Sequence, residues 1–281
     1  MNLQNILPEN GPPIEEVNKY IDKYKQDIIV VKIGGSVLLD TSLFNQLIED
    51  ISIINKLGLS IVAVHGGSKN IKEKLNKANL ESKFINGLRV TNAKTIKIVE
   101  EALIELNNEI IDKLKIKNCN ATSFTINNNI FNVKSISKDL GFVGNPTKVN
   151  GSAILDELKN KNVPIIVPMG LDENNNKFNI NADTAAGAVA KEINSRRLLL
   201  MTDVKGVMDK QDKLIPEIFS KDIKKMIKDK TISGGMIPKI NTCLDAVSNG
   251  VIGCVIVDGR KNHSILFEVF SDKGAGTLIR K

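Results

Sequence analysis

The sequence predicts an α/β protein: a three-layer α/β/α sandwich built around a mainly parallel central sheet. Short apolar runs rich in Ile and Val alternate along the chain with longer segments of helical spacing. Strands that alternate with helices form parallel sheets that helices cover on both faces. Two of these runs lead into glycine pairs, which is typical of tight turns from a strand into a helix.

Length and composition fit a large buried core. The 281 residues suffice for one large α/β domain or for two lobes. Hydrophobic residues make up 42% of the chain and charged residues 25%, which is ordinary for a globular protein. Aromatic residues account for only 4% and Trp is absent, so the core must be packed mainly with Ile, Leu and Val.

Each element is predicted from its local pattern. Helices are indicated where apolar residues recur every three or four positions, and Gly58 closes the second helix. We expect helices over residues 14–26, 43–57, 69–78, 93–116, 152–161, 183–193, 222–228, 238–249 and 264–270. Apolar runs bounded by turn residues predict strands over residues 27–33, 60–64, 163–167, 197–201 and 251–257. Residues 121–150 are expected to form short strands and turns.

The chain is predicted to divide into three parts. Residues 1–26 form an N-terminal extension helix, residues 27–175 a first lobe and residues 176–281 a second lobe. The polar, turn-rich stretch at 172–177 marks the boundary between the lobes.

Charge and cysteine content argue against several classes of protein. The net charge is +7, but the lysines are spread along the chain and few aromatic residues are available to stack on bases. Nucleic-acid binding is therefore not expected. The three cysteines lack CxxC spacing, and only two histidines are present, so no metal site is predicted. The first 13 residues are polar and no apolar run reaches 18 residues, which predicts a cytoplasmic protein.

A lysine lies inside the first predicted strand, just before a glycine pair. Lys32 is flanked by apolar residues and is followed by Gly34 and Gly35. An unpaired ammonium group is costly to bury, so a lysine in this strand requires an anion. The glycines alone would fit a tight turn, but backbone N–H groups at such turns also bind phosphate oxygens.

A second predicted strand ends in the same way, at Gly66 and Gly67. His65 precedes this pair, and no catalytic partner lies near it in the sequence. We therefore predict a structural or orienting role for this histidine. A third strand ends in Thr202 and Asp203, a pattern that alone indicates only a strand followed by a turn.

A second lysine and an acid complete the pattern. Lys239 ends the run Thr-Ile-Ser-Gly-Gly-Met-Ile-Pro-Lys, and Asp183 follows two asparagines at the start of a small-residue helix. Asp183 could simply cap that helix, or it could also hold two lysines in place. Two lysines, two glycine turns and one organising carboxylate are the parts that a phosphoryl-transfer site needs.

Together these motifs resemble the amino acid kinase family, and within it the members that phosphorylate N-acetyl-L-glutamate. The resemblance covers nearly the whole chain, and Asn86–Thr91 and Gly234–Lys239 are its most specific parts. The other matching motifs are Lys32–Gly35, His65–Gly67, Gly141–Gly144, Asn179–Asp183 and Thr202–Val207. One departure is Ser68, which stands where the family usually has a third glycine after the histidine. Its side chain would either crowd the site or add a hydroxyl donor.

The resemblance implies a role for each candidate residue. The catalytic residues would be Lys32, Lys239 and Asp183, with both lysines contacting the transferred phosphoryl group and the leaving phosphate. The amino-acid substrate would be bound by Gly66, Gly67, Arg89 and Asn179. The nucleotide and its phosphates would be bound by Gly34, Gly35, Thr202, Asp203, Lys205 and Gly206. The N–H groups of all four paired glycines would face phosphate oxygens. Mg²⁺ would bridge the phosphates of ATP and be held by phosphate and water rather than by the protein.

The implied activity is ATP-dependent phosphorylation of the side-chain carboxylate of N-acetyl-L-glutamate, the second step of arginine biosynthesis. The first lobe would bind the amino acid and the second ATP. A kinase of the same fold for another acylated amino acid, such as a carrier-linked aminoadipate, is an alternative. A non-catalytic amino-acid sensor is another, although such a protein could lose Lys32, Asp183 or Lys239, and all three are present.

The C-terminal segment 258–277 resembles that of the arginine-sensitive members of the family. The resemblance implies inhibition by L-arginine at a site formed by Tyr20, His263, Glu268, Gly274 and Gly276. It also implies a homo-oligomer, a dimer or more specifically a hexamer, in which the helix over 14–26 interlaces dimers into a ring. The alternative is that 14–26 is an ordinary surface helix and Glu268 a solvated charge.

Overall fold

The structure, a computed structural model, describes residues 3–281; residues 1–2 of the expected N-terminal segment lie outside the described residues. Its central sheet has eight strands, in the order β12-β14-β13-β11-β1-β2-β8-β5. The strands are β1 (Ile28–Ile33), β2 (Ser60–His65), β5 (Ala121–Phe124), β8 (Val163–Ile166), β11 (Arg197–Thr202), β12 (Glu217–Phe219), β13 (Gly253–Asp258) and β14 (Gly276–Arg280). Within this sheet, as residues 3–281 form it, only β13 and β14 pair antiparallel, which confirms the mainly parallel sheet.

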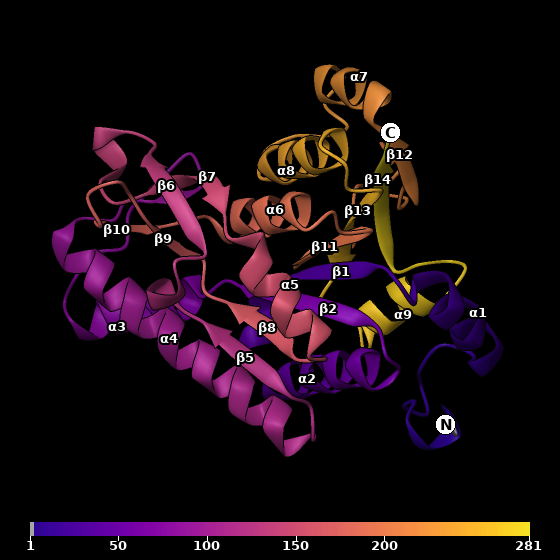
Figure 1. Cartoon of the computed structure of the whole chain (residues 1–281). Coiled ribbons are helices and arrows are strands. Elements are labelled where there is room, and N and C mark those ends of the chain that lie inside the picture. Colours follow the sequence, from indigo (N-terminus) through magenta and orange to yellow (C-terminus); the bar gives the residue numbers. More distant parts are fainter. Residues whose placement is uncertain (1–2) are drawn as a thin grey trace.

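Helices cover both faces of this sheet (Figure 1). They are α1 (Ile14–Tyr24), α2 (Thr41–Lys56), α3 (Ser68–Lys77), α4 (Ala93–Ile116), α5 (Gly151–Lys159), α6 (Ala182–Glu192), α7 (Ile223–Lys228), α8 (Met236–Ser248) and α9 (Ser264–Phe270). In Figure 1, α6 and α8 lie above the sheet, and α2 and α9 lie below it. The α/β/α sandwich predicted from the sequence is therefore confirmed.

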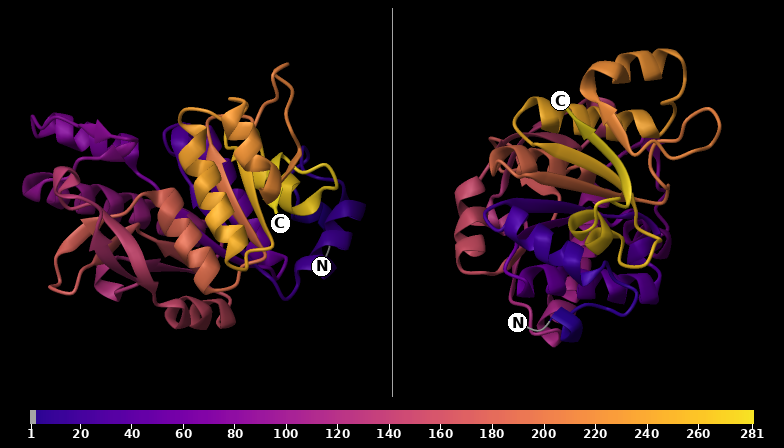
Figure 2. Two further views of the ribbon diagram at one scale, coloured as in Figure 1. Left: turned by 90° about the horizontal axis from the view of Figure 1, so that it is seen from above. Right: turned by 90° about the vertical axis from the view of Figure 1, so that its right-hand side faces the viewer.

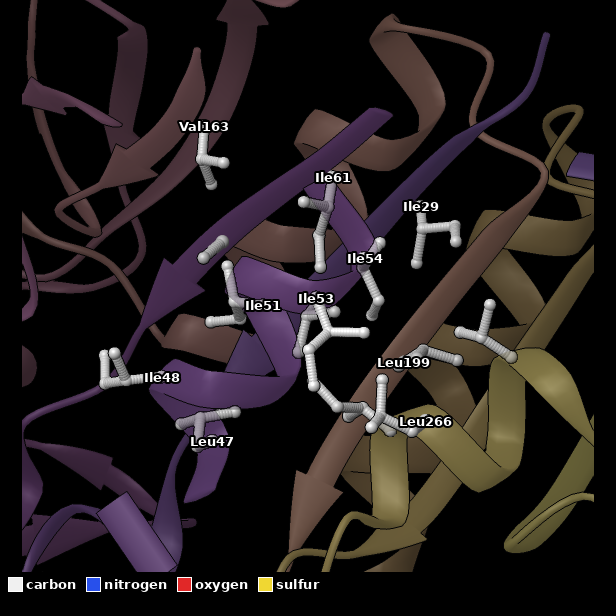
Figure 3. Packing of buried hydrophobic residues seen from close by; sticks show 14 of the residues in the cluster. Ile29, Leu47, Ile48, Ile51, Ile53, Ile54, Ile61, Val163, Leu199 and Leu266 are labelled. Atoms are coloured by element: carbon white, nitrogen blue, oxygen red, sulfur yellow. The ribbon is translucent and has the colours of Figure 1, made fainter. Parts of the chain in front are cut away.

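Side chains along the central strands alternate between the two helical layers. Ile29 and Val31 of β1 belong to the core that includes α2 and α9, whereas Val30 belongs to the core that includes α6 and α8. Successive side chains of a strand point to opposite faces, so an all-apolar strand fills both cores at once. Figure 3 shows the first core, where Ile51 and Ile54 of α2 pack beside strand residues and Leu266 of α9.

Two smaller sheets stand beside the main one. The first has four strands in the order β10-β9-β6-β7, with β6 (Phe131–Ser135), β7 (Gly144–Val149), β9 (Met169–Leu171) and β10 (Lys177–Asn179). The second is the hairpin of β3 (Phe84–Ile85) and β4 (Leu88–Arg89). Its turn residues Asn86 and Gly87 both have positive φ, as a two-residue hairpin turn requires. The short strands expected over 121–150 are confirmed.

The first and last helices of the described chain pack together at one side of the molecule. Helix α1 packs against α9, and Figure 2 shows the indigo and yellow helices side by side in both views. Tyr20 and Tyr24 of α1 are buried in the core on the α2 face. The N-terminal helix expected over 14–26 is thus present and is joined to the C-terminal segment. No helix within residues 3–281 is long and apolar enough to cross a membrane.

The structure differs from the predicted elements at several ends and edges. Helix α2 begins at Thr41 because the Asp40 carboxylate accepts a hydrogen bond from the N–H of Leu43 at 3.0 Å. Gly58, with φ of 84°, ends this helix as expected. Strands β3, β4, β9, β10, β12 and β14 were not predicted. Residue 175, the expected lobe boundary, lies in the turn between the antiparallel strands β9 and β10, and the division into lobes stays a prediction.

Candidate active site

One cavity of about 410 Å³ gathers most of the predicted site residues. It lies where β1, β2 and β11 end, at the shared carboxyl edge of three neighbouring parallel strands. Open α/β sheets bind their ligands at this edge. Among the residues that line it are Lys32, Gly34, Gly35, Gly66, Gly67, Arg89, Asn179, Asp183, Asp203 and Lys239. Residues far apart in the sequence are thus brought to one site, as the motifs predicted.

The centre of the cavity is a carboxylate held between two ammonium groups. Asp183 Oδ1 lies 3.0 Å from Lys32 Nζ, and Asp183 Oδ2 lies 2.7 Å from Lys239 Nζ. The three side chains are only 11–20% exposed. Lys32 comes from β1, Asp183 from the first turn of α6 and Lys239 from the first turn of α8. The expectation that one acid holds both lysines therefore agrees with the geometry.

Asp183 is free for this task because a different residue caps its helix. Asn181 Oδ1 accepts hydrogen bonds from the N–H groups of Asp183 at 3.0 Å and Thr184 at 3.1 Å. The alternative interpretation of Asp183 as the N-cap is therefore wrong. Ala185 and Ala186 are fully buried just after it and let α6 pack closely on the sheet. The carboxylate is thereby placed over the end of β1.

The charges of this cluster favour the binding of an anion. Burial acts to raise the pKa of Asp183, but the charges of Lys32 and Lys239 outweigh it, so the pKa lies below its usual range. The carboxylate is therefore ionised at neutral pH. Two ammonium groups against one carboxylate leave a net positive charge that is shielded from water. A bound anion with several oxygens, such as a phosphate, would compensate this charge.

The turn after β1 brings backbone close to this charge. A side chain at Gly34 would collide with the Lys32 ammonium group, and one at Gly35 would collide with the Asp203 carboxylate. Gly35 also has φ of 77°, which favours glycine. Asp203 Oδ1 accepts hydrogen bonds from Ser36 N at 2.8 Å and Ser36 Oγ at 2.9 Å. Asp203 thus fixes the turn, a contact that the sequence pattern did not reveal.

The turn after β2 is only partly available to a ligand. The Gly66 N–H donates to the carbonyl oxygen of Ile33 at 2.7 Å. This N–H is therefore occupied by the sheet, contrary to the expectation that it faces a phosphate oxygen. Gly66 and Gly67 still line the cavity. Helix α3 starts at Ser68, directly after them, and the first N–H groups of a helix lack partners within it.

His65 is a structural residue, as predicted. It is fully buried, and burial lowers its pKa to about 4, so it is neutral at pH 7. Its Nδ1 lies 3.0 Å from the Gly66 carbonyl oxygen, and its Nε2 lies 3.1 Å from Asn107 Nδ2. Because the Asn107 amide can only donate to Nε2, the ring hydrogen is on Nδ1 and donates to Gly66. The buried ring therefore helps to hold the turn after β2 in place.

Arg89 is a buried charge without a carboxylate partner. Its side chain donates to the hydroxyl of Ser82, and its Nη2 donates to the carbonyl and hydroxyl oxygens of Ser68 at 2.8 and 2.9 Å. Its guanidinium carbon lies 4.7 Å from the centre of the Phe84 ring. Burial lowers its pKa. Within residues 3–281 no carboxylate pairs with it, so the cavity offers a second cation for a ligand.

Only some of the residues expected to bind the nucleotide line the cavity. Asp203 lines the cavity, but Thr202, Lys205 and Gly206 are not among its lining residues. Lys205 is exposed, and Thr202 is buried at the end of β11, where its carbonyl oxygen accepts from the Gly259 N–H at 2.9 Å. Their assignment to the nucleotide stays a prediction. Their positions, directly after β11, place them beside the Asp203 side of the cavity.

Four of the five predicted effector residues share one neighbourhood. Tyr20 donates to Asp272 Oδ1 at 2.8 Å, and the Glu268 carboxylate accepts from the N–H groups of Ala275, at 2.7 Å, and Gly276. Gly274 lies directly beside the same carboxylate. Burial raises the pKa of Glu268, and no ion pair to it is found in the described part of the chain.

His263 is placed differently. It precedes α9, and its Nδ1 lies 2.6 Å from Asp50 Oδ1 of α2. His263 therefore pairs with the buried Asp50 and not with Glu268. This pair could not be predicted from the sequence, because the two residues are far apart in the chain and Asp50 lies within an amphipathic helix.

The sequence also did not predict the residues that orient the main candidates. Ser36, Ser82 and Asn107 each contact a site residue, yet each lies in an unremarkable polar context. No group of three or more His, Cys, Asp or Glu residues that could hold a metal ion occurs within residues 3–281.

The fold and the lysine–aspartate–lysine cluster beside glycine turns define a class of protein, a phosphotransferase on an α/β/α scaffold. The comparisons with known proteins agree. A model of the amino acid kinase family matches residues 27–258. The chain belongs to the amino acid kinase family and is a kinase.

Relatives with assigned names are similar over almost their whole length. The chain is 54% identical over 280 residues to "Acetylglutamate kinase" of Pelagibacter ubique (strain HTCC1062), covering 99% of this chain and 97% of that protein. It is 40% identical over 279 residues to "Acetylglutamate kinase" of Clostridioides difficile (strain 630), covering 97% of this chain and 98% of that protein.

Solved structures share the fold. Protein smu.665 of Streptococcus mutans UA159 has a TM-score of 0.78 at 31% identity, and the match covers 90% of this chain and 98% of that one. N-acetylglutamate synthase of Neisseria gonorrhoeae, complexed with coenzyme A and N-acetyl-glutamate, has a TM-score of 0.85 at 21% identity. The match covers 95% of this chain but only 62% of the synthase, and at this identity it supports the fold alone.

Proposed function

We propose that this kinase transfers the γ-phosphoryl group of MgATP to the side-chain carboxylate of N-acetyl-L-glutamate, a step of arginine biosynthesis. The observation that carries the proposal is one cavity with two separate cationic features. The pair Lys32 and Lys239, held by Asp183, suits a phosphoryl group, and the unpaired guanidinium of Arg89 suits a carboxylate. The 54% identity to an acetylglutamate kinase supports the choice of substrate.

The reaction follows from these positions. A carboxylate oxygen of the acceptor attacks the γ-phosphorus, the bond to the bridging oxygen breaks, and ADP leaves with its electron pair. The acceptor is already ionised at neutral pH, so no general base is required. Lys32 and Lys239 neutralise the charge that spreads over the transferred group, and Asp183 holds them in place before the reaction begins. Catalysis is then positioning and charge neutralisation.

The substrate assignment is tested by comparing acceptors in one assay. ADP release is measured with N-acetyl-L-glutamate, L-glutamate and N-acetyl-aminoadipate, each with MgATP. We expect the highest kcat/KM for N-acetyl-L-glutamate. Preference for the longer acid would favour the alternative of a kinase for another acylated amino acid, such as a carrier-linked aminoadipate. Binding of an acyl amino acid without ATP turnover would identify the protein as a sensor.

We further propose that L-arginine inhibits the enzyme and that it assembles beyond a dimer through α1. Support comes from Glu268, a half-buried carboxylate that lies close to Gly274. Within residues 3–281 its hydrogen-bond donors are the backbone N–H groups of Ala275 and Gly276. The guanidinium group of a bound arginine could form an ion pair with this carboxylate through two parallel hydrogen bonds. Tyr20 joins α1 to the same segment through Asp272, so a ligand there would also contact the helix expected to link dimers.

Arginine inhibition is tested by titrating L-arginine against activity. We expect inhibition in the millimolar range or below. In Glu268→Gln the inhibition constant should rise at least about ten-fold, which corresponds to about 1.4 kcal/mol of arginine binding free energy. The matched control is Glu217→Gln, which changes a surface acid of β12 that pairs with Arg280. Light scattering of the full chain and of a chain lacking residues 1–26 reports the assembly. Insensitivity to arginine, or a dimer in both chains, would contradict this proposal and leave the substrate assignment intact.

A further inference from the structure

The residue that departs from the family pattern is placed against the substrate-binding arginine. Ser68 is the first residue of α3, is exposed, and lines the same cavity as Arg89. Its hydroxyl oxygen and its carbonyl oxygen both accept from Arg89 Nη2, at 2.9 and 2.8 Å. A glycine at position 68 would supply the carbonyl contact but not the hydroxyl contact.

Arg89 has few other restraints on its terminal nitrogens. Nη1 donates to the hydroxyl of Ser82, and the Phe84 ring lies beside the guanidinium plane. A guanidinium group has five N–H donors, so these contacts orient it without using all of them. Two serine hydroxyls therefore hold the group between them, and the remaining donors are available for a ligand in the cavity.

The Ser68 hydroxyl retains its own hydrogen. A serine hydroxyl has one donor and two acceptor lone pairs, and here a lone pair accepts from Arg89. Within residues 3–281 no acceptor for its hydrogen is found among the hydrogen bonds of the structure. The hydrogen is thus available at the cavity, beside the guanidinium group. A carboxylate bound to Arg89 would have an oxygen within reach of both donors.

We propose that Ser68 is a positioning residue that forms one carboxylate-binding unit with Arg89. Its oxygen fixes the guanidinium group, and its O–H donates to the substrate carboxylate that Arg89 holds. This inference rests on the proposed function and deepens it, because it assigns the family-divergent serine to recognition of the non-reacting carboxylate. It replaces the simpler interpretation that the side chain only crowds the site.

Kinetics of Ser68 variants test the inference. In Ser68→Ala and Ser68→Gly, we expect the KM for N-acetyl-L-glutamate to rise about ten-fold, the effect of one charge-assisted hydrogen bond. The kcat and the KM for MgATP should stay within about two-fold, since the serine does not touch the reacting atoms. Ser68→Thr retains a hydroxyl and should restore most of the loss. The control is Ser152→Ala, which removes a hydroxyl from the first turn of α5, outside the cavity.

A double-mutant cycle with Arg89 shows whether the two residues act together. Arg89→Lys keeps the charge but loses the planar fork, so it should raise the KM for the acyl amino acid much more than that for ATP. If the two form one unit, Ser68→Ala adds much less to the KM in the Arg89→Lys background than in the wild type. Fully multiplicative effects would overturn the inference.

Two further outcomes would also overturn it. A lower KM in Ser68→Gly would show that the side chain only crowds the substrate. An unchanged KM in Ser68→Ala, in an enzyme that phosphorylates N-acetyl-L-glutamate, would remove the role of Ser68 and leave the proposed function intact. Absence of that activity in the wild-type protein would instead refute the proposed function itself.

Discussion

Replacing either Lys32 or Lys239 with alanine is expected to lower kcat by about 10²-fold or more while the protein stays folded. A preorganised electrostatic contact that acts mainly in the transition state has an effect of about this size. In each variant Asp183 keeps one lysine partner, at 2.7 Å or 3.0 Å, so the carboxylate is not left unpaired. Stopped assays of ADP formation and circular dichroism measure the two quantities.

The chain offers a matched control for this experiment. Lys191 of α6 pairs with Asp245 of α8 and so joins the two helices that carry Asp183 and Lys239. It lies outside the cavity. Lys191→Ala removes a lysine between the same helices and should keep near-normal turnover, because an exposed ion pair adds little stability. Near-normal turnover in Lys32→Ala or Lys239→Ala would mean that the assignment of that lysine is wrong.

Asp183→Asn is expected to reduce both activity and stability. It leaves the ammonium groups of Lys32 and Lys239 close together with no anion between them. Removing one member of a buried charged cluster commonly lowers the free energy of unfolding by about 3–5 kcal/mol. We also expect a fall in kcat comparable to that of the lysine variants, because both lysines lose the carboxylate that holds them.

The difference in free energy of unfolding between the wild type and Asp183→Asn is expected to shrink as the pH falls. The folded-state pKa of Asp183 is lowered from its ordinary value of 3.8. Its contribution to stability is therefore complete above that value and is lost as the pH falls below it. Urea unfolding at pH 7 and pH 3.5 should show a smaller difference in the free energy of unfolding between wild type and Asp183→Asn at the lower pH.

Added phosphate should stabilise the variant at pH 7, because it can bind between the two lysines that have lost their carboxylate. Equal stability of the two proteins at pH 7 would contradict the organising role.

The central fold could be predicted because the strands are apolar on both sides. In β1, Ile29, Val30 and Val31 fill two different cores. A short run of β-branched residues next to turn residues favours such a buried strand. The edge strands were harder to predict from the sequence. β14 mixes Gly276, Thr277 and Arg280 with apolar residues, and β12 has only three residues, so neither gives a periodic signal.

The centre of the site was predictable for a related reason. Lys32 interrupts an apolar strand, and a charge in such a position needs a partner. The sequence could not show which groups would be taken by other parts of the fold. The Gly66 N–H is used by the Ile33 carbonyl, and Asn181 rather than Asp183 caps α6. The first outcome depends on a neighbour that is distant in the chain. The second is local, but Asn and Asp are about equally good N-caps, so the pattern did not show which of the two would cap the helix.

The cluster of Lys32, Asp183 and Lys239 also determines when the enzyme becomes active during folding. Asp183 and Lys239 are separated by 56 residues in the chain, and Lys32 comes from the opposite end of the sequence. Contacts between such distant residues form only after the intervening loops have closed, which makes them slow to appear. In the folded protein β1 lies between β2 and β11, and α6 and α8 bring their charges over its end. We therefore expect phosphoryl transfer to recover late during refolding, after the helices and strands have formed.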